Sequence, residues 1–151
     1  MEQTGRPMTL WRGNCYAHVE FRRESLLRLR NAYPEAKVVV HPESLREVRD
    51  LADAICSTEK MITFCRHTPA REIIVVTEAG MLHRLKKEIP GKLFIPGPTE
   101  QCVCAECRYM KLNTLEKAHA ALLNMEPEII LPEALRKRAE APILRMLELS
   151  S

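Results

Sequence analysis

Cysteine is the residue type in this sequence whose chemistry stands out first. The chain has 6 cysteines in 151 residues, and in a reducing compartment a disulfide framework is rare. Cys102, Cys104 and Cys107 fall in one short stretch beside Gly and Pro that must be a loop. Cys15 lies far upstream of them in the sequence. Thiols this dense indicate a metal or an iron–sulfur cluster. Cys56 and Cys65 lie in apolar surroundings and are predicted to be packing residues.

The spacing of the loop thiols bears on which metal they would bind. A structural zinc site takes paired arms of the C-x₂-C type. Cys104 and Cys107 form one such arm, but the sequence has no second arm, and Cys15 lies far away along the chain. An iron–sulfur cluster tolerates widely separated cysteines, and with fewer than four thiolates it keeps an open iron that can act as a Lewis acid. The pattern therefore lacks half of a zinc site and is compatible with a cluster.

A histidine and a carboxylate follow a β-branched run. His41 and Glu43 are separated only by Pro42, so an extended backbone would let both side chains reach one cavity and move protons. The alternative is that His41 is a hydrogen-bonded polar residue at the end of a strand, without a role in catalysis. His67, His83 and His119 lie on or beside expected helices without partners, and we interpret them as surface or packing residues.

Two hydroxyl residues stand where a helix is expected to begin. Ser57 and Thr58 precede the amphipathic stretch 59–66. A helix N-terminus with free N–H groups and hydroxyls is a natural site for phosphate or carboxylate. Ser57 alone, like Ser44, would more often be a simple helix cap. The sequence leaves both interpretations open.

The elements that must position these residues alternate between short β-branched runs and amphipathic stretches. Strands are expected at 9–11, 37–40, 54–56, 73–76 and 92–95. Helices are expected at 24–32, from Ser44 onward with Glu47 as its capping-box partner, at 59–66 and at 81–88. This alternation predicts an α/β fold, a three-layer αβα domain with a parallel sheet of about four strands.

Ligands of parallel α/β sheets bind outside the carboxyl ends of the strands. Each expected strand is followed by a thiol, imidazole, carboxylate or hydroxyl group. The residues concerned are Cys15, His18, His41, Glu43, Ser57, Thr58, Thr77, Glu78 and Cys107. We therefore expect these side chains to gather at one edge of the sheet and to form the mouth of an active site.

The C-terminal part has a different character. Residues 97–112 are expected to form a loop that holds the clustered cysteines, and Asn113 with Glu116 predicts a capped helix to about residue 125. Pro132 suits the first turn of a last helix, which Pro142 should kink or end. We expect an αβα domain at 9–107 and a helical segment at 108–151.

Composition excludes several classes of protein. The chain is 46% hydrophobic and 28% charged with a net charge of +3, as in a globular protein. No basic block with interleaved aromatics is present, so nucleic acid is not an expected partner. The apolar runs are far shorter than the about 20 residues of a membrane span, and the N-terminus lacks the apolar core of a signal peptide. These features predict a cytoplasmic protein without a membrane partner.

Several unusual short strings together resemble the quinolinate synthase family. The resemblance covers residues 10–124. The strings are Gly13-Asn14-Cys15-Tyr16-Ala17-His18, His41-Pro42-Glu43, Ser57-Thr58, Thr77-Glu78-Ala79-Gly80, and Cys107 with Met110-Lys111-Leu112-Asn113. The order of these strings and the intervals between them match the family as well.

The resemblance implies three similar αβα domains around a pseudo-threefold axis, of which this chain resembles the third with its C-terminal helices. It implies a transferase of de novo NAD biosynthesis that condenses iminoaspartate with dihydroxyacetone phosphate to quinolinate, phosphate and water. It also implies a central [4Fe–4S] cluster held by one cysteine from each domain, whose fourth iron binds substrate. L-aspartate oxidase is the implied functional partner.

Carried onto this sequence, the resemblance implies that Cys15 and Cys107 are two of the three cluster ligands. His18, His41 and Glu43 resemble active-site residues, with Glu43 a candidate acid or base. Ser57 and Thr58 resemble the pair that holds an anion. The third ligand would come from upstream domains, so this chain is expected to be a fragment or subunit that works with a polypeptide carrying them.

Two rival hypotheses remain from the sequence. One is a non-catalytic iron–sulfur or metal-binding module that kept the clustered thiols Cys102, Cys104 and Cys107. The other is a bare α/β domain whose polar edge residues no longer have a function. The presence of a coding region for the other two domains, just upstream of Met1, would discriminate between these hypotheses and an enzyme subunit.

Overall fold

The structure is a computed structural model that describes residues 5, 7, 13–99 and 105–149. It divides into two compact units, Met1–Lys111 and Leu112–Ser151. The expected strand at 9–11 and the thiols of Cys102 and Cys104 lie outside the described residues.

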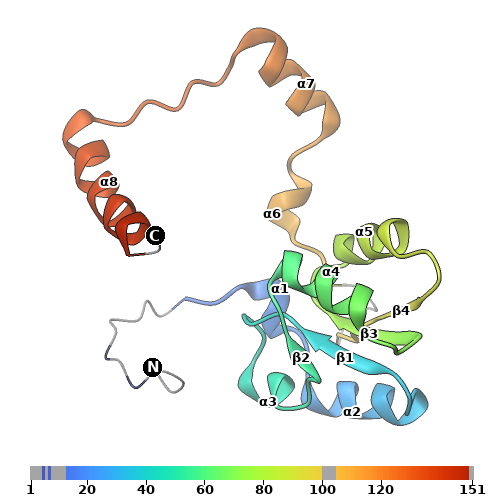
Figure 1. The fold of residues 1–151 in the computed structure, drawn as a ribbon. Helices are drawn as coiled ribbons and strands as arrows, with labels where there is room; N and C mark the ends of the chain where they lie inside the picture. The colour runs from blue at the N-terminus through green and yellow to red at the C-terminus, as the bar shows by residue number, and fades with distance from the viewer. Residues whose placement is uncertain (1–4, 6, 8–12, 100–104, 150–151) are drawn as a thin grey trace. The chain divides into compact units, whose positions relative to one another are not determined.

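The first unit is built on a four-stranded sheet in which every strand pair is parallel (Figure 1). The strands are β1 (Lys37–Val40), β2 (Ala54–Ile55), β3 (Glu72–Val76) and β4 (Leu93–Pro96), in the order β2-β1-β3-β4. The register places Val39 beside Val75 and Ile74 beside Ile95. The predicted parallel α/β sheet is confirmed.

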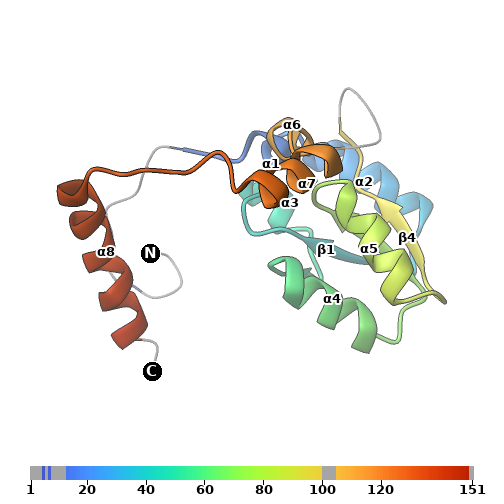
Figure 2. The same cartoon turned by 90° about the horizontal axis from the view of Figure 1, so that it is seen from above.

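Helices cover both faces of this sheet, as Figures 1 and 2 show. The helices of this unit are α1 (Tyr16–Val19), α2 (Arg23–Ala32), α3 (Arg46–Arg49), α4 (Thr58–His67), α5 (Gly80–Glu88) and α6 (Arg108–Lys111). On one face, α4 and α5 bury Met61 and Leu85 against Ile73 and Val75. The other face is covered by α2 and α3.

The layered packing follows from the alternation of side chains along a strand. On the face covered by α2 and α3, Leu26 and Val48 are buried against the β3 residues Ile74 and Val76. β-branched residues fill both faces because no face of the sheet meets water. The predicted packing role of Cys56 and Cys65 is confirmed for their positions, because both thiols are buried, and burial raises the pKa of Cys65 to about 11.

Two local expectations in this unit are wrong. Ser44 does not cap a helix: α3 begins at Arg46 with Leu45 at its N-cap, and the buried Ser44 hydroxyl makes no hydrogen bond within the described part of the chain. The segment expected to be a loop contains the short helix α6. At Ser44, burial of the side chain decides the backbone path more strongly than the local capping pattern.

The second unit contains α7 (Leu115–Asn124) and α8 (Glu133–Glu148). The expected cap at Asn113 is wrong by one residue, because the hydroxyl of Thr114 accepts the N–H of Lys117 at 3.3 Å. Pro132 is the N-cap residue of α8, one position before the first turn in which it was expected, and Pro142 lies inside that helix and does not end it. Large apolar side chains of both helices are exposed, including Leu115, Leu122, Leu144 and Leu147. Among the described helices, none is both long and apolar enough to cross a bilayer.

Candidate active site at the carboxyl edge of the sheet

A cavity of about 430 Å³ in the first unit brings the predicted site residues together. Its lining includes nearly all of the residues singled out from the sequence, namely Cys15, His18, His41, Glu43, Thr58 and Cys107. Ser57 does not line it. These residues come from sequence positions up to 92 apart, so the fold, and not local sequence, makes the cavity.

The parallel strands explain why these residues meet. His41 directly follows β1 and Thr77 directly follows β3. The two strands are paired in register up to Val40 and Val76, and the N–H of His41 donates to the carbonyl of Val76 at 3.0 Å. Both side chains therefore leave the same carboxyl edge of the sheet, where open α/β sheets bind their ligands.

Two imidazoles and one carboxylate form the polar centre of the cavity. The rings of His18 and His41 are stacked, with centroids 4.2 Å apart and an interplanar angle of 15°. Oε2 of Glu43 lies 3.3 Å from Nδ1 of His18 and 3.6 Å from Nδ1 of His41. The other ring nitrogen of His18, Nε2, is 3.0 Å from the hydroxyl of Thr77.

Burial controls the protonation of this centre. Desolvation lowers the pKa of both His18 and His41 below the ordinary value. The neighbouring imidazole lowers the pKa of His18 further, whereas Glu43 acts in the opposite direction on both rings. Because the desolvation effect is the larger one, both rings are neutral at neutral pH and able to accept a proton or bind a metal.

The loop that carries Glu43 is held in place from its far side. The guanidinium of Arg49, in α3, donates to the carbonyls of Pro42 at 2.8 Å and Ser44 at 3.0 Å. The N–H of Glu43 itself lies 3.4 Å from Nδ1 of His41. The backbone on both sides of Glu43 is thus fixed, while its carboxylate remains partly open to solvent and to the cavity.

The two described thiols of the cavity are free and half-buried. Cys15 is the N-cap residue of α1, and Cys107 directly precedes α6. Three contacts hold the segment that carries Cys107. The carbonyl of Ala105 accepts the N–H of Ala79 at 2.8 Å, and the hydroxyl of Tyr16 donates to the carbonyl of Glu106 at 3.4 Å and accepts the N–H of Arg108.

This donor set fits part of an iron–sulfur cluster. Two free thiols face one cavity, and the segments that carry them are tied together through Tyr16, whose ring also meets the ring of Tyr109 edge-on at 5.7 Å. A cluster needs thiolates, and this part of the chain provides two. The described residues therefore fit one side of such a cluster.

The predicted anion pair is only partly brought to the cavity. α4 begins at Thr58, and Thr58 lines the cavity. Ser57 is the exposed N-cap residue, but its hydroxyl makes no capping bond and the residue does not line the cavity. The first N–H groups of a ten-residue helix thus lie beside the cavity, with only Thr58 as hydroxyl partner.

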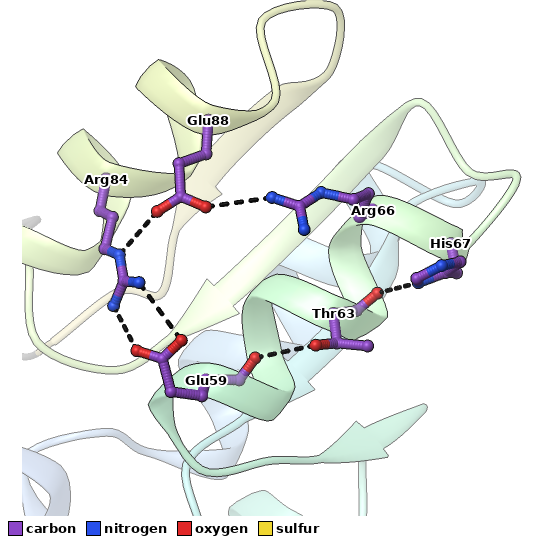
Figure 3. A network of polar contacts seen from close by, with 6 residues as sticks. All are labelled: Glu59, Thr63, Arg66, His67, Arg84 and Glu88. Atoms are coloured by element: carbon purple, nitrogen blue, oxygen red, sulfur yellow. Dashed lines mark hydrogen bonds and ion pairs between the residues drawn. The ribbon is translucent and has the colours of Figure 1, made fainter.

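Sequence reasoning missed one cation of the site. Arg84 lines the cavity and is held by α4 and by its own helix, as Figure 3 shows. Its guanidinium contacts both carboxylate oxygens of Glu59, at 2.6 and 3.2 Å, and Oε1 of Glu88 at 2.7 Å. Glu88 also pairs with Arg66. The signal available in the sequence was the i, i+4 spacing from Gly80, which belongs to the string Thr77-Glu78-Ala79-Gly80 and places Arg84 on the same helix face.

Comparison with known proteins assigns a family to this arrangement. The family model described as "Quinolinate synthetase A protein" matches residues 1–148. Proteins named quinolinate synthase are similar to the chain: 44% identical in Nostoc punctiforme over 99% of this chain and 47% of the relative. In Prochlorococcus marinus the identity is 44% over 98% of this chain and 45% of the relative, and in Synechocystis it is 45% over 99% and 48%.

The chain spans about half the length of the curated relatives that it matches. The match nevertheless covers nearly all of this chain, including every described residue of the cavity. The resemblance read from the short sequence strings is therefore confirmed at the level of the family: this chain belongs to the quinolinate synthetase A family.

Proposed function

We propose that this chain is a fragment or subunit of a quinolinate synthase, which condenses iminoaspartate with dihydroxyacetone phosphate to quinolinate, phosphate and water in de novo NAD biosynthesis. The observation that carries the proposal is that two thiols line the same cavity as two neutral imidazoles and a carboxylate. Under this proposal, L-aspartate oxidase is a functional partner and the chain acts in the cytoplasm.

Cys15 and Cys107 are the residues that would hold a [4Fe–4S] cluster in this proposal. When bound, such a cluster supplies a Lewis acid through an iron without a protein thiolate. The family resemblance implies a third thiolate, which we assign to a polypeptide with the upstream domains. Tyr16 supports this role, because its hydroxyl ties the segment that carries Cys107 to the helix that begins after Cys15.

His41 and Glu43 are assigned the proton transfers. Condensation with loss of water needs groups that accept and return protons near neutral pH. His41 is neutral because burial lowers its pKa, and its Nδ1 lies 3.6 Å from Oε2 of Glu43. A proton taken up by the ring can pass to the half-exposed carboxylate, which connects the cavity with solvent. His18 holds the other side of the carboxylate.

The beginning of α4 is assigned the binding of a substrate anion. Helix N-terminal N–H groups favour phosphate and carboxylate, and the Thr58 hydroxyl adds a donor beside them. Arg84 helps to fix the N-terminal end of α4, because its guanidinium pairs with the carboxylate of Glu59 in the first turn of that helix. Ser57 could join this subsite only by a rotation of its side chain into the cavity, since it does not line the cavity here.

The test is anaerobic reconstitution of the chain with a polypeptide that carries the upstream half of a cyanobacterial relative. We expect iron, sulfide and quinolinate formation to appear together in the mixture and not with the chain alone. Cys107→Ser should abolish both, and Glu43→Gln should abolish quinolinate formation with the cluster retained. His67→Gln, at an exposed position of α4, is the matched control.

Two outcomes would contradict the proposal. A mixture that assembles the cluster but makes no quinolinate would favour a non-catalytic iron–sulfur or metal-binding module. A Cys107→Ser variant that keeps a full cluster in the mixture would contradict the assignment of that thiol as a ligand.

A further inference from the structure

Three side chains with different metal-binding atoms meet at one side of the cavity. The thiol of Cys15, the imidazole of His18 and the carboxylate of Glu43 place one ligand atom each within 4.8 Å of the other two. We propose that these three residues form a mononuclear site for a divalent transition-metal ion, best matched by Zn²⁺. This site goes beyond the proposed function, because it needs no thiolate from another polypeptide.

The state of His18 is the first argument. The residue is only 7% exposed, and its Nδ1 makes no hydrogen bond of acceptable geometry within the described part of the chain. Oε2 of Glu43 nevertheless lies only 3.3 Å from that nitrogen. A buried polar atom without a partner is costly and calls for an explanation such as a bound ion.

The tautomer of His18 sharpens this point. Nε2 contacts the hydroxyl of Thr77 at 3.0 Å, and if Nε2 carries the proton, Nδ1 directs a free lone pair at the carboxylate of Glu43. Two electron-rich atoms then face each other, and either a proton or a metal cation must lie between them. A cation satisfies both atoms.

The spacing fits a tetrahedral ion. Zn²⁺ binds imidazole nitrogen at about 2.0–2.1 Å and carboxylate oxygen at about 2.0–2.2 Å, so the edge between two such ligands measures about 3.3–3.4 Å. The observed separation of His18 Nδ1 and Glu43 Oε2 is 3.3 Å. One ligand atom of each of Cys15, His18 and Glu43 lies within 4.8 Å of the other two, so the thiol is close enough to complete a three-ligand site.

The backbone prepares two of the three ligands locally. Cys15 is the N-cap residue of α1 and His18 lies in its first turn, and the N–H of His18 donates to the carbonyl of Cys15 at 2.9 Å. Glu43 joins them through the parallel pairing of the sheet and the loop held by Arg49. The contact from His18 to Thr77 is the outer-shell bond that usually orients a histidine ligand.

The donor set selects the class of ion. One thiolate, one imidazole and one carboxylate suit Zn²⁺ or its spectroscopic substitute Co²⁺, whereas Mg²⁺ and Ca²⁺ prefer oxygen ligands only. Three protein ligands leave a fourth position for water. Because Cys15 is also assigned to the cluster, a mononuclear ion and the cluster exclude each other, and the ion is expected in the chain without its upstream partner.

The test is a titration of the full 151-residue chain, freed of metal, with Co²⁺ and then Zn²⁺ under anaerobic conditions. We expect one equivalent of Co²⁺ to give a thiolate charge-transfer band and tetrahedral visible bands, which Zn²⁺ abolishes. Cys15→Ser should remove the charge-transfer band. His18→Gln and Glu43→Gln should weaken binding by at least tenfold, and Thr77→Val by about tenfold, as for other outer-shell partners.

Two variants keep the test decisive. Cys107→Ser should leave the affinity and the charge-transfer band unchanged, and His67→Gln is the control for a histidine outside the cavity. If Cys15→Ser and Cys107→Ser lower the affinity for Co²⁺ equally, the proposal is overturned in favour of a site with two thiols. An absence of Co²⁺ bands in a chain whose circular dichroism shows it to be folded would also overturn it. This titration does not depend on quinolinate formation. A failure of the metal-site proposal can therefore be told apart from a failure of the proposed function.

Discussion

The imidazole rings of His18 and His41 are stacked with their centroids 4.2 Å apart, although the two residues are 23 positions apart in the sequence. One ring comes from the short helix α1 and the other from the end of β1. Oε2 of Glu43 lies near a nitrogen of each ring. This three-residue centre is where protonation, metal binding and catalysis are expected to interact.

The stability of the chain should fall as the medium becomes acidic through the range where histidine titrates. Burial keeps the pKa of His18 and His41 in the folded chain below the ordinary value of 6.5. Well above pH 6.5 both rings are neutral in the folded and in the unfolded chain, so their titration does not lower the free energy of unfolding. As pH falls below that value, the unfolded chain binds protons that the folded chain excludes, and stability is lost.

The measurement is the urea midpoint at closely spaced pH values between 8 and 5. We expect a midpoint that is level above pH 7 and then declines, and a shallower decline in a double variant with His18→Gln and His41→Gln. His119→Gln, an exposed position of α7, should keep the slope of the natural chain. Equal slopes for all three proteins would contradict the burial argument.

Removing the Tyr16 hydroxyl should loosen the segment that carries Cys107. The Tyr16→Phe variant keeps the ring that meets Tyr109 but loses the bonds to Glu106 and Arg108. We expect Cys107 to be alkylated several-fold faster, as measured by mass spectrometry of the labelled peptide, with little change at the buried Cys65. Tyr33→Phe, beside the core under α2, is the matched control. An unchanged rate would show that the hydroxyl does not hold this segment.

Arg84 should matter more for the reconstituted enzyme than Arg66 does. Both guanidinium groups pair with Glu88 on the surface, but only Arg84 also grips Glu59 and lines the cavity. Arg84→Gln should therefore lower kcat/KM by roughly tenfold through a misplaced α4 N-terminus, as small displacements of positioning groups do. Arg66→Gln should leave it nearly unchanged. Similar losses in both variants would point to a general effect of surface charge.

A methyl group at Gly97 should destabilise the fold. A Cβ built there would lie 3.1 Å from Cα of Val76 and 3.2 Å from the carbonyl oxygen of Val75, so it would press on a buried strand. We expect Gly97→Ala to lower the free energy of unfolding by about 1–3 kcal/mol, as overpacking does. Gly91→Ala, where a Cβ meets nothing within 4 Å, should change it by less than about 1 kcal/mol. Urea denaturation of both variants compares them directly.

The sequence by itself determined the layers of the first unit and the edge at which its polar residues gather. Runs such as 37–40 and 73–76 are β-branched and bury both faces, which is possible only in a sheet covered on both sides. Because parallel strands end at a common edge, the residue after each run had to lie there. The positions of His41, Glu43 and Thr58 follow from that rule.

Only the tertiary structure decided which way individual side chains point. Ser57 and Thr58 are neighbours in sequence, yet only Thr58 lines the cavity. Ser44 has the pattern of a helix cap but is buried and does not cap α3. The stacking of His18 on His41, and the reach of Tyr16 to the backbone around Cys107, join segments far apart in the chain. Local periodicity fixes the face of an element, whereas such contacts depend on how packed elements are placed in three dimensions.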